Sequence, residues 1–264
     1  MIGCFWGVAH SMKMDGNTVF ITGGTSGIGK GLAEAFHQRG NEVIIAGRRE
    51  ARLREICGRH PGMHYFVLDV TDPQAILAVA NRAIREFPAL NCVFNNAGIQ
   101  NRFDFSPGNS LDEQALQAEI NTNLLGAIRV AAAFIPHLAT RPGATLVNVS
   151  SGLAYVPMAR SPVYCATKAA LHALTLSLRH QLRSSGVKVI ELVPPWVATE
   201  LGGPGKPAPA STAGRGPMPL DAFIAEAMRE LESGAEEVAI GDAKRLVAAT
   251  CLETVKKVFS AINQ

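Results

Sequence analysis

The residues best suited to chemistry are a serine, a tyrosine and a lysine between positions 151 and 168. Tyr164 and Lys168 are spaced i and i+4, so on a helix their side chains share one face. A phenol titrates near pH ~10, and a neighbouring ammonium favours the phenolate, so we expect Lys168 to lower the pKa of Tyr164. Ser151 closes an apolar stretch and could offer its hydroxyl to a substrate carbonyl. Together the three groups predict proton transfer to or from a carbonyl or alcohol.

A Tyr-x-x-x-Lys pair alone is commonplace, and its simplest interpretation is an exposed pair on a helix. The surrounding elements therefore matter. From residue 18 onward, short apolar runs alternate with helical patterns. Continuously apolar strands that alternate with helices are typical of a doubly wound parallel sheet, the Rossmann type of α/β fold, with helices on both faces. The seven predicted strands are 18–22, 42–47, 64–68, 90–95, 144–150, 188–193 and 237–241.

Helix termini are recognisable between these strands. Asp72 is a good N-cap, because Pro73 follows it at the first helical position. Ser110 and Glu113 have the spacing of a capping box, so a helix is expected to begin at Ser110. The predicted helices are 27–39, one that follows Asp72, one from 110, 162–184 and 221–232.

A glycine-rich turn joins the first strand to the first helix. Its pattern is Gly23-x-x-x-Gly27-x-Gly29, which differs from the commoner Gly-x-Gly-x-x-Gly. Glycines at such a turn bring backbone N–H groups close to a pyrophosphate at the helix N-terminus. A plain tight turn is the alternative, but the position between a strand and a helix favours dinucleotide binding. The cofactor contacts expected here are Gly23, Thr25, Ser26, Gly27, Ile28 and Gly29.

The end of the second strand predicts which dinucleotide binds. An acidic residue ~20 positions past the glycines usually binds the adenine ribose and repels a 2′-phosphate. Here Gly47 leaves room, and Arg48 and Arg49 supply two guanidinium groups, which grip phosphate through charge-assisted hydrogen bonds. Both arginines could instead be solvated residues at a helix start, with Glu50 partly neutralising one. The absence of an acidic residue at the end of this strand and the presence of two arginines favour NADP(H) over NAD(H).

Composition excludes several classes of protein. With 264 residues, 47% of them hydrophobic, the chain can bury one large core. The net charge of +3 is weak and scattered, so nucleic acid is not expected as a partner. No apolar stretch reaches the ~18 residues that a membrane span needs. We expect a flexible extension over residues 1–16 and a single domain over 17–264.

The five cysteines are widely spaced and odd in number, which indicates reduced thiols in a cytoplasmic protein. One metal-like spacing exists, formed by Cys57, His60 and His64. It lacks a fourth partner nearby and crosses from a helix end into a strand, so no metal site is predicted.

The chain resembles the classical short-chain dehydrogenases/reductases over residues 17–200, and within them the DltE-type oxidoreductases. Stretches 149–154, 162–170, 176–182 and 218–223 carry the closer likeness. The motifs that carry the family resemblance are Thr22-Gly23-x-x-x-Gly27-x-Gly29, Asp69-Val70, Asn95-Asn96-Ala97-Gly98, Asn123, Ser151 and Tyr164-x-x-x-Lys168.

The resemblance implies a role for each catalytic residue. Tyr164 is implied as the general acid/base and Ser151 as the group that orients the carbonyl. Lys168 would lower the pKa of the phenol and hold the nicotinamide ribose. Asn123 would hold a water that relays protons from Lys168 toward solvent.

The same resemblance implies further cofactor contacts along the carboxyl edge of the sheet. One departure is Pro194-Pro195 where the family commonly has Pro-Gly, because Pro195 removes a backbone donor beside the substrate. The implied contacts are Asp69 and Val70 near the adenine, Asn96, Ala97 and Gly98 along the cofactor, and Val197 and Thr199 at the nicotinamide.

An NADP(H)-dependent oxidoreductase acting on a carbonyl or alcohol is the leading interpretation. The alternative is a non-catalytic redox sensor or scaffold that binds the dinucleotide on the same fold. A sensor needs the glycine loop and Asn96, but it does not need the full catalytic set, which is present. An epimerase or dehydratase also uses Tyr and Lys, but such relatives usually carry a larger substrate domain than the short stretch after Thr199.

Three expectations remain. Residues 200–220 are rich in Gly and Pro, and we expect a mobile lid there, with a passive linker as the alternative. Surplus apolar residues such as Ile128 and Leu176 predict a homodimer or homotetramer. An apolar substrate pocket, or simple packing, is indicated by Leu153, Ala154, Tyr155, Val156, Met158 and Trp196.

Overall fold

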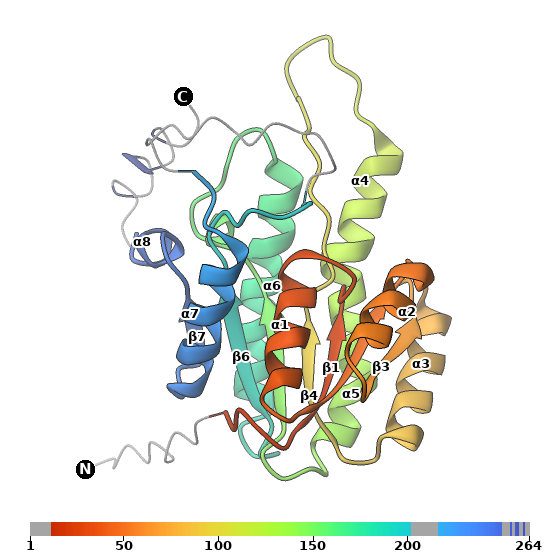
Figure 1. Ribbon diagram of the computed structural model, residues 1–264. Coiled ribbons are helices and arrows are strands. Elements are labelled where there is room, and N and C mark those ends of the chain that lie inside the picture. Colours follow the sequence, from red (N-terminus) through yellow and green to blue (C-terminus); the bar gives the residue numbers. More distant parts are fainter. Residues whose placement is uncertain (1–11, 202–215, 250–253, 255–256, 259–260, 262–264) are drawn as a thin grey trace, which may run out of the picture.

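The computed structural model describes residues 12–201, 216–249, 254, 257–258 and 261. Seven parallel strands form one sheet in the order β3-β2-β1-β4-β5-β6-β7 (Figure 1). The strand order reverses between β1 and β4, and in sheets of this class ligands bind at the carboxyl ends of the strands beside such a reversal. The strands are β1 Thr18–Thr22, β2 Glu42–Gly47, β3 Met63–Val67, β4 Leu90–Asn95, β5 Thr145–Val149, β6 Lys188–Val193 and β7 Glu237–Ala239.

Helices cover both faces of the sheet (Figure 1). Each face has its own apolar core. Phe36, Leu53 and Phe223 belong to the core under α1, α2 and α7, whereas Ile76 and Phe134 belong to the core under α3 and α5. The helices are α1 Gly27–Gln38, α2 Glu50–Arg59, α3 Pro73–Glu86, α4 Glu113–Ile120, α5 Ala127–Leu138, α6 Pro162–Gln181, α7 Leu220–Glu232 and α8 Ala243–Val247, with π-helix η1 Asn121–Gly126 and 3-10 helix η2 Gly152–Ala154.

The predicted doubly wound parallel sheet is confirmed, and four of its seven strands have the predicted bounds. Asp72 caps α3 as expected, since its carboxylate accepts from the backbone N–H groups of Gln74 and Ala75. The helix start predicted at Ser110 from the capping box is wrong. Helix α4 begins at Glu113, where the Asp112 carboxylate accepts from the Ala115 N–H at 2.9 Å. A carboxylate already placed to cap that N–H makes the earlier serine unnecessary.

The amino-terminal residues correct another expectation. Residues 1–11 of the predicted extension lie outside the described part of the chain. The side chains of Met12 and Met14 are buried in the core beneath α1, and Asn41 Nδ2 donates to the Met14 carbonyl at 2.9 Å. Residues 12–16 therefore pack against the domain and do not form part of a flexible extension. No helix in the described ranges has the length and apolarity that crossing a membrane demands.

Candidate active site

Tyr164 and Lys168 lie in the first turns of α6, which begins with Pro162 at its first position. Both side chains are buried, and the Lys168 ammonium nitrogen lies 5.7 Å from the centroid of the Tyr164 ring. Lys168 Nζ donates to the Val149 carbonyl at 2.7 Å, at the carboxyl end of β5. Helix α6 thus delivers a phenol and an ammonium together to the end of the central strands.

Burial controls the acidity of this pair. It raises the pKa of Tyr164, opposed by a hydrogen bond with Ser151 and reinforced by the charges of Cys165 and Glu119. Burial also lowers the pKa of Lys168 to about 8, opposed by the charge of Glu191. The Tyr164 pKa is therefore raised and not lowered as expected, because burial has the largest effect on it. Tyr164 keeps its proton at neutral pH and is an acid rather than a base there.

Ser151 follows β5 directly and caps the short helix η2. Its hydroxyl oxygen accepts from the Leu153 N–H at 3.1 Å, and its side chain is hydrogen-bonded to Tyr164. The serine and tyrosine hydroxyls therefore lie together, so that both can reach one substrate oxygen.

Asn123 lies inside the π-helix η1 between α4 and α5. Its Oδ1 accepts from the Ile99 N–H at 2.8 Å, and its Nδ2 donates to the Ile99 carbonyl, also at 2.8 Å. Nδ2 donates in addition to Thr167 Oγ1 at 3.2 Å. A β-carbon on Gly98 would lie 3.4 Å from Asn123 Oδ1 and 3.7 Å from Lys168 Nζ. Asn123 thus fastens the loop after β4 beside the active site. Both of its amide donors are used in doing so.

The glycine turn after β1 is built around the loop after β4. A β-carbon on Gly29 would lie 2.3 Å from Asn96 Nδ2, and one on Gly23 would lie 2.8 Å from the Ala97 α-carbon. Gly23 and Gly27 also have φ values of +69° and +53°. The Asn96 side chain holds the turn by donating to the Thr22 carbonyl at 2.9 Å. Only glycine fits this arrangement.

The N-terminus of α1 fits a dinucleotide pyrophosphate. Its N-cap Ser26 makes no capping hydrogen bond, and the first turn holds no acidic residue. The N–H groups at this end are thus free of side-chain caps, and a helix N-terminus favours an anion. Thr199 lies against the same turn, 3.2 Å from where a β-carbon on Gly27 would be.

The two arginines after β2 differ in their surroundings. Arg49 Nη2 donates to Thr25 Oγ1 at 2.7 Å and to Ser26 Oγ at 2.8 Å, and Nη1 pairs with Glu200. Arg48 is exposed and makes no hydrogen bond or ion pair with the described residues. The room expected beside Gly47 is filled, because a β-carbon there would lie 2.9 Å from the Thr25 methyl group.

Asp69 and Val70 follow β3. The Asp69 carboxylate accepts from the N–H and hydroxyl of Thr71, at 2.9 and 2.8 Å, so it organises its own turn. Val70 is buried, and its carbonyl would lie 2.8 Å from a β-carbon on Gly126 in the π-helix. Val70, at the adenine side of the expected site, therefore packs against the π-helix η1.

The predicted lid falls mostly on residues 202–215, which lie outside the described part of the chain. The residues that flank it are paired. Val197 forms a parallel bridge with Met218, and the Ala198 N–H donates to the Met218 carbonyl at 2.9 Å. Before this bridge, the Pro194 carbonyl accepts from the Gly152 N–H at 3.0 Å, next to Ser151.

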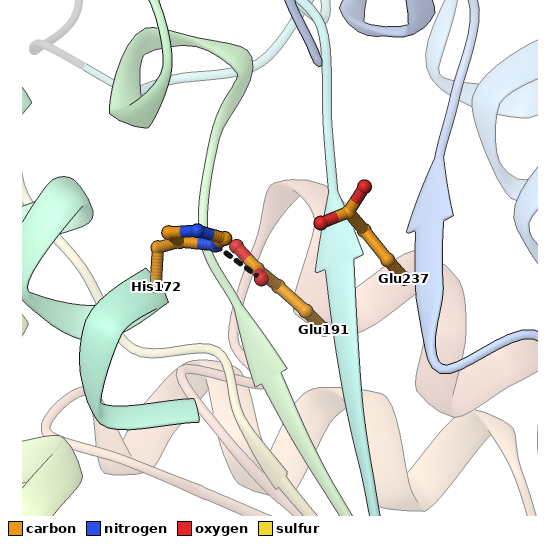
Figure 2. A group of neighbouring side chains, drawn as sticks. All are labelled: His172, Glu191 and Glu237. Atoms are coloured by element: carbon orange, nitrogen blue, oxygen red, sulfur yellow. Dashed lines mark hydrogen bonds and ion pairs between the residues drawn. The ribbon is translucent and has the colours of Figure 1, made fainter. Parts of the chain in front are cut away.

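Sequence reasoning missed a group of side chains beside this site. The Tyr155 hydroxyl, expected in an apolar pocket, donates to Glu237 at 2.7 Å and lies 3.1 Å from His172 Nδ1. His172 Nδ1 is 2.7 Å from Glu191 Oε2 (Figure 2). One signal was available, since Glu191 is a charged residue with apolar neighbours on both sides in the middle of a strand.

Known proteins are similar to this chain over most of its length. A model of the short chain dehydrogenase family matches residues 17–208. The uncharacterized oxidoreductase DltE of Bacillus subtilis is 49% identical over 191 residues, which cover 72% of this chain and 75% of that protein. Sulfoacetaldehyde reductase 2 of Chromohalobacter salexigens is 35% identical over 187 residues, 69% of this chain and 73% of that protein.

A solved structure supports the fold. The crystal structure of a short chain dehydrogenase from Burkholderia cenocepacia in complex with NADP has a TM-score of 0.80 and 24% identity, and the match covers 96% of this chain and 100% of that one. Fold, family model and relatives agree with the motifs around Tyr164. The chain therefore belongs to the short chain dehydrogenases, a family of NAD(P)-dependent oxidoreductases.

Proposed function

We propose that this protein is an NADP(H)-dependent oxidoreductase that transfers a hydride between nicotinamide and a carbonyl or alcohol substrate. One observation carries the proposal. Tyr164 is buried, hydrogen-bonded to Ser151, and on the same helix face as Lys168, at the carboxyl end of the sheet. A protein that only bound the dinucleotide would need the glycine turn but not this buried group.

The bound nicotinamide would supply or accept the hydride, and the chain's own residues would manage the proton. In the reducing direction, Tyr164 donates its proton to the substrate oxygen as the carbonyl carbon takes the hydride. Its raised pKa keeps that proton available at neutral pH. Ser151 donates a hydrogen bond to the same oxygen, and the Lys168 ammonium stabilises the phenolate left behind. The product is the alcohol.

Ser26 and the glycine turn would bind the pyrophosphate, and Asn96 would hold the glycine turn in place. Thr199 lies close to the same turn. The preference for NADP(H) rests on Arg48, the exposed guanidinium that is not engaged by described residues. Arg49 is already held by Thr25, Ser26 and Glu200, so it would shape the pocket instead. The NADP in the Burkholderia structure belongs to that protein, and its presence there is consistent with this preference.

Substrate screening tests the proposal. Purified protein is mixed with NADPH and a panel of aldehydes and ketones, including small sulfonated aldehydes because one relative is a sulfoacetaldehyde reductase. Loss of the absorbance of reduced nicotinamide is followed against protein that carries Tyr164→Phe. We expect turnover with at least one class and none with the variant. Tight NADPH binding without any turnover would favour a redox sensor or scaffold.

We also propose a homodimer or homotetramer that forms through α5 and α6. Ile128 on α5 is 37% exposed and Leu176 on α6 is 46% exposed, and large apolar side chains at such levels are suited to a protein interface. Light scattering at micromolar concentration should show more than one chain per particle, and Leu176→Glu should dissociate it. A monomeric wild-type protein would contradict this assembly.

A further inference from the structure

Four polar side chains form a row across the sheet next to the active site. Asn95, Asn148, Glu191 and Glu237 are register partners on β4, β5, β6 and β7, so they project from one face of the sheet. The first three are buried, and Glu191 has no exposed surface. A buried carboxylate in the middle of a strand destabilises the fold unless its charge is compensated.

Helix α6 covers this row with polar residues of its own. Lys168, His172 and Thr175 are spaced i, i+4 and i+7, so they share the face of α6 that meets the sheet. Thr175 Oγ1 accepts from Asn148 Nδ2 at 2.9 Å, and His172 Nδ1 lies 2.7 Å from Glu191 Oε2 (Figure 2). Lys168 continues the same face one turn toward the catalytic tyrosine.

Tyr155 ties the row to the segment that carries Ser151. It follows η2 directly, and its ring centroid lies 4.7 Å from that of His172. Its hydroxyl donates to Glu237 Oε2 at 2.7 Å and lies 3.5 Å from Glu191 Oε2. The group made of Tyr155, His172, Glu191 and Glu237 is called the carboxylate cluster below. It touches both segments that supply catalytic side chains.

One oxygen of the cluster has no hydrogen-bond partner among the residues that the structure describes. Glu191 Oε2 is bonded to His172, but the buried Oε1 accepts no hydrogen bond from the described residues. Burial lowers the pKa of Lys168, whereas the charge of Glu191 raises it. Buried opposite charges of this kind compensate each other.

A metal ion is the alternative occupant. Ligand atoms of His172, Glu191 and Glu237 lie within 4.8 Å of one another, in the one group among the described residues that could hold an ion. The Tyr155 hydroxyl, however, lies 3.1 Å from His172 Nδ1, 3.5 Å from Glu191 Oε2 and 2.7 Å from Glu237 Oε2. The hydroxyl therefore takes the place between them that an ion would need.

We propose that Glu191 is a positioning residue for the reaction, whose buried carboxylate, held by the rest of the cluster, stabilises the ammonium of Lys168 beside Tyr164. The catalytic part of this inference rests on the proposed function. Glu191 acts through Lys168 and needs no contact with substrate or cofactor. The other titratable groups that face the pair are Tyr164 and His172 on α6, Glu119 on α4, Tyr155 after η2 and Glu237 on β7.

The test follows the titration of Lys168 itself, without substrate or cofactor. The full chain carries ¹³C-labelled lysine, and the ε-carbon signal of Lys168, assigned with Lys168→Arg, is titrated by NMR. In Glu191→Gln, which keeps the shape of the side chain and removes its charge, the pKa of Lys168 should fall by about 1 unit. The matched control is Glu236→Gln, an exposed carboxylate paired with Arg179 outside the cluster, which should leave the pKa unchanged.

Folding of each variant is checked by thermal melting. If Glu191→Gln does not fold, Glu191→Asp withdraws the carboxylate by one methylene and should lower the same pKa by a smaller amount. An unchanged Lys168 titration in the folded variant would overturn the inference. So would stoichiometric zinc in the purified protein that is lost in Glu191→Gln, because the cluster would then be a metal site.

Kinetics separate this inference from the proposed function. On a confirmed substrate, the alkaline limb of kcat in Glu191→Gln should move to lower pH by the same shift, because the ammonium is lost earlier. An unmoved limb would overturn the inference and leave the enzyme assignment intact. Absence of turnover in the wild-type protein would remove the proposed function, while the NMR titration would still decide whether Glu191 controls Lys168.

Discussion

The proposed site has two halves, one for the cofactor and one for catalysis, and different physical interactions stabilise them. The cofactor half, at the turn from β1 to α1, depends on close contact, since a β-carbon at Gly29 would lie 2.3 Å from Asn96 Nδ2. The catalytic half, between β5, β6 and α6, depends on charge, since Lys168 and Glu191 are buried together. The cofactor half requires glycines, which have no side chains, and the catalytic half requires buried charged side chains.

This difference determines how each half responds to change. A close contact fails when any atom is added, whatever its charge. A compensated pair of charges tolerates a change of shape better than the loss of one partner, which leaves the other charge buried and alone. Substitutions in the two halves should therefore separate binding from chemistry.

The largest expected effect is a loss of turnover without a loss of cofactor binding. Tyr164→Phe removes the transferable proton and leaves the ring in place, so kcat should fall by about 10³-fold or more while NADPH affinity stays nearly unchanged. Lys168→Ala should impair both, because the proposed role of Lys168 is to stabilise the phenolate and to bind the nicotinamide ribose. Steady-state kinetics and calorimetric titration with NADPH measure the two effects. Substantial activity in Tyr164→Phe would remove Tyr164 from the role of general acid.

The next effect is on the cofactor half. Gly29→Ala should lower the free energy of unfolding by about 1–3 kcal/mol through overpacking, and should weaken dinucleotide binding with it. The control is Gly58→Ala in α2, where a β-carbon meets nothing within 4 Å, so the free energy should be unchanged or slightly raised. Urea denaturation measures both. Equal changes in the free energy of unfolding for the two variants would contradict the close contact at Gly29.

A smaller effect concerns pH and the catalytic half. Lys168 has a pKa of about 8 when folded and 10.5 as its ordinary value, so the unfolded chain binds this proton more tightly. Its contribution to the free energy of unfolding should rise with pH between about 8 and 10.5, by about 1–3 kcal/mol. The difference in urea stability between wild type and Lys168→Met, measured at several pH values without cofactor, should show this rise. A difference independent of pH would contradict a buried, titrating lysine.

The smallest effect tests selectivity within the cofactor half. Arg48→Ser should weaken NADPH binding by about tenfold and leave NADH binding unchanged, because one charge-assisted contact is lost. Arg49→Ser should disturb both cofactors, since Arg49 holds Thr25 and Ser26. Calorimetry at one ionic strength compares the four affinities. Comparable affinity of the wild type for NADPH and NADH would remove the proposed preference.

The same contrast explains what could be predicted from the sequence. Strand periods, Asp72 and the glycine turn are local signals, so the sheet and the N-terminus of α1 were predictable. The bonds of Asn123 to Ile99 and of His172 to Glu191 join different elements, and only the folded arrangement brings these residues together. The π-helix around Asn123 also has no local signal in the sequence, and Asn123 within it bonds the loop after β4.

Acidity was the least predictable property. Spacing places Lys168 one turn from Tyr164, but it says nothing of how deeply both are buried. Burial raises the pKa of Tyr164, the reverse of the shift expected from a neighbouring charge alone. A pKa depends on desolvation as much as on neighbours, and desolvation is a property of the folded chain.

The most direct measurement of the central claim is the transfer of the hydride itself. NADPH that carries deuterium at the transferable position of the nicotinamide is incubated with the protein and a carbonyl compound, and the alcohol is examined by mass spectrometry. The wild-type protein should place one deuterium on the former carbonyl carbon, and Tyr164→Phe should place essentially none. Absence of deuterium in every alcohol tested, with NADPH shown to be bound, would contradict the assignment of this site to carbonyl reduction.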